Sequence, residues 1–152
     1  MTPSGLRRKI VAERTAWVRR MLAGIRGLPL ETFELFRSDP RTVAAAESYL
    51  RRALEGLLDL GRHILAKGFG RAVTEYKDVA IVLADVGVLD AQVGLLFRDL
   101  AGYRNRLVHF YHEVSEVELY EICTTQIRDV DAVLGALLAW IEAHPEKIDQ
   151  GL

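Results

Sequence analysis

The sequence has little cysteine: Cys123 is the single one among 152 residues. One cysteine can form neither an internal disulfide nor a cysteine-based metal site, so both are excluded within one chain. Because Cys123 falls within an apolar helical pattern, we expect a small core residue. We expect no secretory signal, because the basic cluster near the start is followed by alternating charge rather than an apolar stretch.

Long hydrophobic runs are also lacking. The longest uncharged apolar run, residues 133–141, has nine residues, whereas a membrane-spanning helix needs about 20. With a single cysteine and no spanning segment, we expect a reducing, cytoplasmic setting. No stretch alternates apolar and polar residues as a strand would, and no repeat or low-complexity segment occurs.

The charges are nearly balanced but unevenly placed. There are 20 Lys and Arg against 21 Asp and Glu, a net charge of −1, which excludes a histone-like basic coat. Residues 1–26 nevertheless hold seven basic residues and one acidic residue, leaving 13 basic and 20 acidic residues beyond them. Half of the residues are apolar, and this length is typical of one domain. We expect a single domain over 1–152, with a tail from about 144.

Apolar residues recur at helical spacing along most of the chain. Asp39-Pro40, Asp90 and the capping-box pair Ser115 and Glu118 are typical of helix starts. The pattern predicts an all-α fold, an antiparallel up-and-down bundle of five to six helices. The expected helices are 6–25, 32–36, 40–67, 74–85, one that Asp90 caps and that runs to about 109, and one from 115 to about 143.

One segment, residues 102–111, carries chemistry. It reads Gly-Tyr-Arg-Asn-Arg-Leu-Val-His-Phe-Tyr. Arg104 offers a planar fork of donors suited to a phosphate, and His109 can exchange a proton near neutral pH. Asn105 can orient either group, and Tyr111 adds a hydroxyl and a stacking surface for a base. Together they suit cleavage of an RNA phosphodiester, with His109 as general acid or base and Arg104 stabilising the charge on phosphate.

Helix geometry limits how these groups can cooperate. In a regular helix, Arg104 and His109 point about 140° apart. They can share a phosphate if the helix breaks, if long side chains converge in a cleft, or if a second copy of the chain contributes across a two-fold axis. No compact set of carboxylates and histidines with metal-ligand spacing accompanies the motif, so we expect metal-free chemistry and no cofactor.

A plainer interpretation of the same residues stays open. Arginine and histidine at a helix end often serve as C-terminal capping charges, and Tyr111 would then be a boundary aromatic. Arg106 and His112 can extend a phosphate-binding surface, although such side chains are more often solvated. The basic first helix can guide RNA or form a solvated face. We expect His63, on the long third helix, to be a satisfied or partly exposed histidine.

The segment 102–111 resembles the signature of the HEPN superfamily, which is Arg, a gap of four to six residues, and His. More narrowly it resembles the HepT-like branch, in which Arg-x4-His-x-Tyr follows a glycine and an aromatic residue. Arg104 and His109 match the catalytic pair, Asn105 the polar residue beside the arginine, and Tyr111 the tyrosine. Weaker similarity extends over residues 49–55, 58–64, 76–78 and 87–89.

The resemblance implies a biological role that composition does not. HepT-like proteins are helical homodimers with Arg and His in a cleft between subunits, and many are ribonuclease toxins, with tRNA implicated as a target. Their usual partner is an MntA-type minimal nucleotidyltransferase antitoxin, which silences the toxin by adding AMP to the motif tyrosine, here Tyr111. A non-catalytic helical adaptor that binds a nucleotidyltransferase or a nucleotide, and a purely structural dimerisation domain, remain the alternatives.

Overall fold

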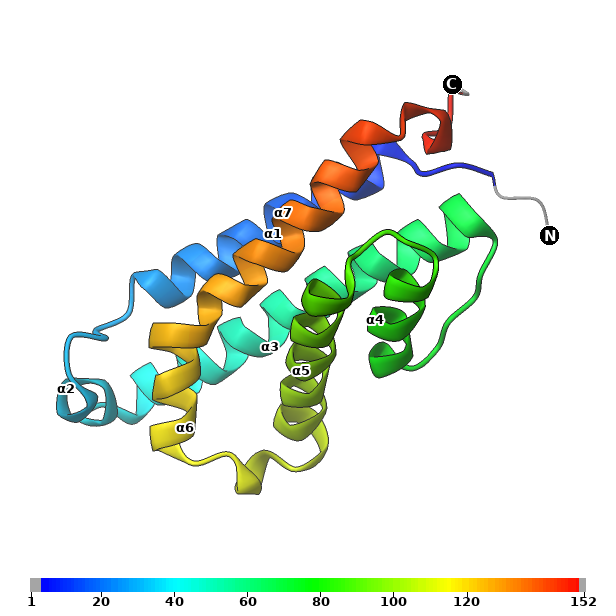
Figure 1. Cartoon of the computed structure of the whole chain (residues 1–152). Helices are drawn as coiled ribbons and strands as arrows, with labels where there is room; N and C mark the ends of the chain where they lie inside the picture. The colour runs from blue at the N-terminus through cyan, green and yellow to red at the C-terminus, as the bar shows by residue number, and fades with distance from the viewer. Residues whose placement is uncertain (1–3, 151–152) are drawn as a thin grey trace.

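Helices make up most of the computed structural model, which describes residues 4–150 apart from the side chain of Tyr111 (Figure 1). Two π-helical turns extend the regular helices: 64–68 continues α3, and 122–126 joins α6 to α7 into one rod. The predicted all-α class and the six predicted helices are therefore confirmed. The α-helices are α1 (Arg8–Arg26), α2 (Phe33–Arg37), α3 (Pro40–His63), α4 (Tyr76–Asp85), α5 (Ala91–His109), α6 (Glu116–Glu121) and α7 (Ile127–Ala143).

Two predicted caps set the ends of the segment that holds the motif. The Asp90 carboxylate accepts the backbone N–H of Val93 at 2.8 Å and starts α5. Ser115 Oγ accepts the N–H of Glu118 at 3.1 Å and starts α6. The second half of the expected capping box is replaced, because the Glu118 carboxylate binds Arg106 of α5. The side chain that should close the cap instead ties two helices together.

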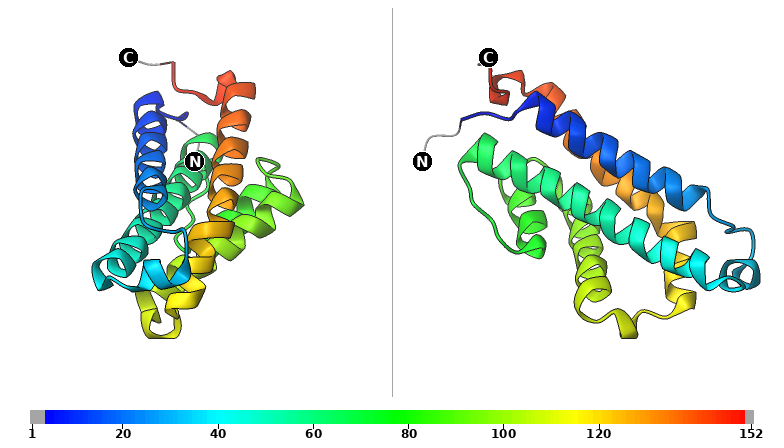
Figure 2. Two further views of the ribbon diagram at one scale, coloured as in Figure 1. Left: turned by 90° about the vertical axis from the view of Figure 1, so that its left-hand side faces the viewer. Right: turned by 180° about the vertical axis from the view of Figure 1, so that it is seen from behind.

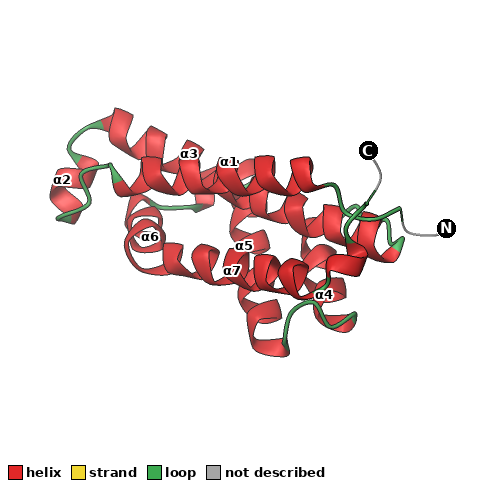
Figure 3. Ribbon diagram, turned by 90° about the horizontal axis from the view of Figure 1, so that it is seen from above, coloured by secondary structure: helices red, strands yellow, loops and turns green. Residues whose placement is uncertain are grey.

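The long helices α1 and α3 lie side by side, and α7 packs against α3 and α5 (Figures 2 and 3). Gly56 allows the close approach of α1 and α3, because a Cβ there would lie 2.8 Å from Trp17 Cδ1. On another side of α3, α4 and α5 pack together, and Phe97 of α5 is fully buried against Gly61 of α3. This packing places the C-terminal half of α5 beside the middle of α3.

The two ends of the described chain are joined beside the end of α3. Leu6 is fully buried and forms a parallel bridge with Ile148, while the N–H of Gly5 donates to the Lys67 carbonyl at 2.9 Å. Within residues 4–150 this bridge is the one β pairing. None of the helices in that range is at once long and apolar enough to cross a bilayer.

Candidate active site at the end of helix α5

The motif occupies the last turns of α5 and the connection to α6. The helix is α-helical from Ala91 to His109 without a π or 3₁₀ break, and a 3₁₀ turn follows over 111–113. The predicted position at a helix end beside a loop is thus confirmed. Since the helix is regular, the directions of Arg104 and His109 stay about 140° apart, and a helix break does not bring them together.

Arg104 is held against α3 and α4. Its Nη2 and Nε donate to Glu55 Oε2 at 2.9 and 3.3 Å, and its Nη1 donates to Asn105 Oδ1 at 3.3 Å. The guanidinium carbon lies 4.6 Å from the centroid of the Tyr76 ring, a cation–π contact. With 19% of its side chain exposed, Arg104 is held in one orientation by Glu55, Tyr76 and Asn105 together.

The partners of Arg104 belong to a larger network of charges. Glu55 also accepts from Arg51 at 2.7 Å. The Tyr76 hydroxyl donates to Asp59 at 2.9 Å, and Arg62 lies over the same ring at 4.7 Å. Burial, followed by the Asp59 carboxylate, raises the pKa of Tyr76, so its hydroxyl keeps its proton and remains a donor at neutral pH.

Sequence reasoning did not identify Glu55 and Tyr76 as partners of the motif arginine. Glu55 stands four residues after Arg51 on α3, the spacing of an ordinary surface ion pair, and it is 49 residues away from Arg104. Only the packing of α5 on α3 shows that this carboxylate serves two arginines.

His109 lies apart from Arg104. Its imidazole is exposed, and its one ring contact is an edge-on approach to Phe110 with centroids 6.4 Å apart. No hydrogen bond or ion pair joins it to any residue that the structure describes. Within one chain, the predicted catalytic pair therefore lies on different sides of α5. Arg104 is held by hydrogen bonds, whereas His109 is exposed to solvent.

Arg106 is engaged by its own chain. It forms a two-pronged ion pair with Glu118, whose second contact is 3.0 Å, and Nη2 donates to the Glu113 carbonyl at 3.3 Å. The hydrogen bond that Arg106 donates to the Glu118 carboxylate raises the pKa of Arg106. These contacts tie α5 to α6 across the connecting turn, which leaves Arg106 few free donors for a ligand.

A surface cavity of about 570 Å³ opens on the motif. Phe110, half of whose surface is exposed, is at its rim. The other residues around it are Lys77, Arg98, Asp99, Gly102, Tyr103, Asn105 and Arg106. Aromatic and basic side chains in one cavity suit a nucleotide, since bases stack and phosphates pair with cations. Two candidate residues from the sequence remain. The Tyr111 side chain lies outside the described residues, and His112 is exposed.

Among the described residues, no group of three or more His, Cys, Asp or Glu is arranged to hold an ion. The groups present are guanidinium, imidazole, amide and aromatic rings, which bind and polarise phosphate and move protons.

Known proteins resemble the chain in sequence and in fold. A curated protein of Archaeoglobus fulgidus named "Putative RNase" is 26% identical over 110 residues, which are 72% of this chain and 80% of that protein. The HEPN toxin of Shewanella oneidensis, solved tri-AMPylated in complex with MNT antitoxin, has a TM-score of 0.77 at 18% identity over 86% of this chain and 97% of that one. The cytosolic protein YutE of Bacillus subtilis has a TM-score of 0.76 at 18% identity over 93% and 94%. Both structural likenesses concern the fold.

The family assignment comes from the sequence. The model of the family described as "Ribonuclease HepT-like" matches residues 18–137, which include α3, α4, α5 and the whole motif segment. With this match over most of its length, the chain belongs to the HepT-like ribonuclease family.

Proposed function

We propose that the chain is a metal-independent endoribonuclease, the toxin of a toxin–antitoxin pair. The observation that carries this proposal is the state of the two motif residues: Arg104 is oriented by Glu55 and Tyr76, and His109 is exposed at the end of the same helix. A fixed cation stabilises developing charge without reorganising, and an open imidazole can reach a substrate proton. The substrate in this proposal is RNA, with tRNA as the first candidate, and the place of action is the cytoplasm.

The chemistry requires only groups that the chain supplies. One His109 takes the proton of a ribose 2′-hydroxyl, whose oxygen attacks the adjacent phosphorus. The bond from phosphorus to the 5′-oxygen breaks, and that oxygen takes up the proton that the imidazole has received, leaving a 2′,3′-cyclic phosphate and a 5′-hydroxyl. Arg104 stabilises the extra negative charge on the phosphate oxygens.

A homodimer supplies what one chain lacks. Because α5 is regular, its Arg104 and His109 diverge. A two-fold axis beside α5 would bring the Arg104 of one copy toward the His109 of the other.

Cleavage of RNA by purified protein in the presence of EDTA tests the proposal. We expect products with a 2′,3′-cyclic phosphate or a 3′-phosphate, and activity lower by at least about a hundredfold in Arg104→Ala and in His109→Ala. Arg128→Ala and His144→Ala, which change the same residue types on α7 and in the tail, are the controls and should cleave normally. Undiminished cleavage in both motif variants, with circular dichroism confirming the fold, would reject the assignment.

The partner in this proposal is an MntA-type nucleotidyltransferase that adds AMP to Tyr111. The residues on either side of Tyr111, Phe110 and His112, are both exposed. AMP there would bring a phosphate and a base to the end of α5 and compete with the substrate for Arg104.

Mass spectrometry after coexpression with the partner tests this regulation. We expect a mass increase of one AMP on the peptide that contains Tyr111, and loss of RNA cleavage. Tyr111→Phe should cleave RNA and resist silencing. AMP on another residue, or silencing of Tyr111→Phe by the same route, would contradict the modification site.

One observation favours the second candidate, a helical adaptor for a nucleotidyltransferase. Arg104 is paired with Glu55, and Arg106 is paired with Glu118. An arginine whose charge is already neutralised by a carboxylate of its own chain does not require a phosphate ligand. A stable complex with the nucleotidyltransferase, together with unmodified protein that cleaves no RNA, would support the adaptor.

A further inference from the structure

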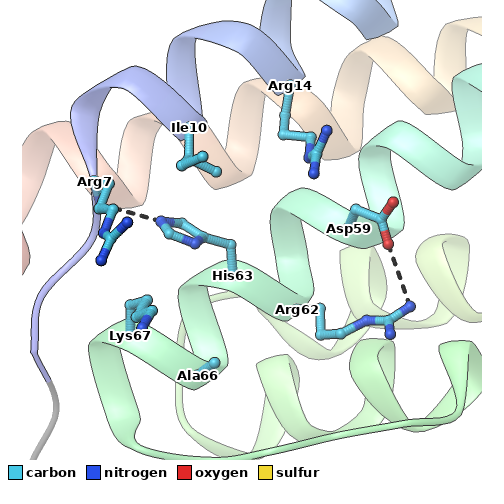
Figure 4. A pocket seen from close by; sticks show the side chains of 8 residues that line it. All are labelled: Arg7, Ile10, Arg14, Asp59, Arg62, His63, Ala66 and Lys67. Atoms are coloured by element: carbon cyan, nitrogen blue, oxygen red, sulfur yellow. Dashed lines mark hydrogen bonds and ion pairs between the residues drawn. The ribbon is translucent and has the colours of Figure 1, made fainter.

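A cavity of about 430 Å³ lies between the start of α1 and the end of α3, away from the tip of α5 (Figure 4). In Figure 4, Arg14 extends from α1 toward α3, and His63 and Asp59 project from α3. The polar residues around the cavity are Arg7, Arg14, Asp59, Arg62, His63 and Lys67.

The cavity carries an excess of positive charge. Four cationic side chains face one carboxylate, and that carboxylate, Asp59, already accepts from Arg62 at 3.2 Å and from the Tyr76 hydroxyl at 2.9 Å. The structure records no hydrogen bond or ion pair from the side chains of Arg7, Arg14 and Lys67 to a described residue. The cavity therefore suits a negatively charged group from another molecule.

The backbone that carries these cations is fixed. The N–H of Arg7 donates to His63 Nε2 at 3.1 Å, and the preceding residue, Leu6, is buried and bridged to Ile148. Lys67 lies in the π-helical turn that ends α3, and its carbonyl accepts from Gly5. Such turns are frequent at functional sites. The backbone positions from which these cations extend are thus fixed before any ligand binds.

A second cavity continues the first toward the motif. It has a volume of about 410 Å³ and shares Arg14 and Asp59 with the first. Its wall also contains Glu55 and Tyr76, the two residues that hold Arg104. The half-buried ring of Trp17 is part of the same wall. We call the two cavities together the basic groove.

We propose that the basic groove binds the backbone of single-stranded RNA, with Arg7, Arg14 and Lys67 as phosphate contacts leading to Arg104. Cations spaced along a groove beside an aromatic surface are typical of single-strand binding, because phosphates pair with the cations and bases stack on the ring. A lone phosphate would need one cluster of donors, whereas these cations extend over two adjoining cavities. This inference rests on the proposed ribonuclease function for the identity of the ligand.

The experiment measures RNA binding separately from cleavage. All proteins carry His109→Ala, and fluorescence anisotropy follows a labelled single-stranded RNA oligonucleotide between roughly 50 and 200 mM salt. The groove variant is Arg7→Gln, Arg14→Gln and Lys67→Gln together. The matched control is Arg8→Gln, Lys9→Gln and Arg19→Gln, which removes the same charge from exposed side chains of α1 outside the groove.

The groove variant should bind RNA at least about tenfold more weakly at low salt, and the slope of log K against log salt should fall by roughly 2, since each lost phosphate contact on a single strand accounts for roughly 0.7. The control should change Kd by less than about threefold. Equal RNA binding by the groove variant and the control would overturn the proposal. So would a lack of RNA binding by the protein that carries His109→Ala alone. Normal RNA binding combined with a lost nucleotidyltransferase complex would also overturn it and assign the groove to a protein partner.

The outcomes for the groove and for the ribonuclease are separable. If the chain with an intact motif cleaves no RNA and yet only the groove variant loses binding, the groove stands and the proposed activity falls. If the chain cleaves RNA and the groove variant binds as the control does, the activity stands and the groove falls.

Discussion

Arg104 of α5 donates two hydrogen bonds, of 2.9 and 3.3 Å, to one oxygen of Glu55 on α3, while Arg51 occupies the other oxygen. The carboxylate thus connects a motif residue to the longest helix of the bundle. Since the Tyr76 ring covers the same guanidinium, the helices α3 and α4 determine where the positive charge of the motif points.

A double-mutant cycle on unfolding free energy measures this relationship. Glu55→Gln and Arg104→Gln should each destabilise the fold, and the double variant should be more stable than the sum of the two predicts, by about 1 kcal/mol. The reason is that the pair is largely shielded, with side chains 25% and 19% exposed. Urea unfolding followed by circular dichroism provides the four free energies.

The matched control is the exposed pair Arg26 and Asp131, whose side chains are 52% and 46% exposed. Because solvent screens exposed ion pairs, its coupling should stay below about 0.5 kcal/mol. A coupling between Glu55 and Arg104 no larger than that of the control would mean that the carboxylate does not position the arginine.

The fold was predictable because its determinants are local. Apolar spacing and the caps at Asp90 and Ser115 locate helices without knowledge of distant contacts, and both caps are present. The motif was recognisable for the same reason, since its residues are contiguous. The environment of the motif depends on tertiary packing instead: Glu55 reaches Arg104 across 49 positions.

Glu118 shows how packing overrides a local rule. The sequence Ser115-Glu-Val-Glu118 predicts a glutamate that turns back to the serine. Instead, Arg106 lies one helix away, and a charged two-pronged pair is stronger than a cap to a neutral N–H. The Glu118 carboxylate accordingly binds Arg106. Arg106, which the sequence suggested as part of a phosphate-binding surface, thus makes a contact within its own chain.

Cys123 should be chemically silent in the folded protein. It is 2% exposed, and burial raises the pKa of its thiol from 9.0 to about 12. Since the thiolate is the reacting form, this shift alone lowers the reactive fraction by roughly a thousandfold. Ellman's reagent at neutral pH should detect no thiol until denaturant is added, and then one per chain. Rapid labelling of the native protein would contradict this burial, and Cys123→Ala provides the blank.

His63 should make stability depend on pH. Burial, then the charges of Lys67, Arg7 and Arg14, lowers its pKa from 6.5, and its Nε2 accepts a hydrogen bond only while the ring is neutral there. The unfolded chain therefore binds a proton at higher pH than the folded chain does. Stability is full above about pH 6.5 and falls as the pH drops through the lowered pKa.

Unfolding free energies across this range should thus decrease less in His63→Gln, whose amide oxygen can still accept from Arg7. Titration of the His63 ring by NMR gives the pKa directly. A midpoint above 6.5, or parallel stability curves for the two proteins, would contradict the effect of the surrounding cations.

Mixing two inactive variants tests whether the active site spans two copies of the chain. Arg104 and His109 diverge along a regular α5, so each site should take its arginine from one copy and its histidine from the other. In a heterodimer of Arg104→Ala with His109→Ala, one site then has both residues and the other has neither. Random exchange makes half of the dimers mixed, so about a quarter of the normal activity should return. Cleavage is measured after co-refolding equal amounts, with each variant refolded alone as the control. Activity that stays at the level of the single variants would show that both residues must come from the same chain or that both sites are needed together.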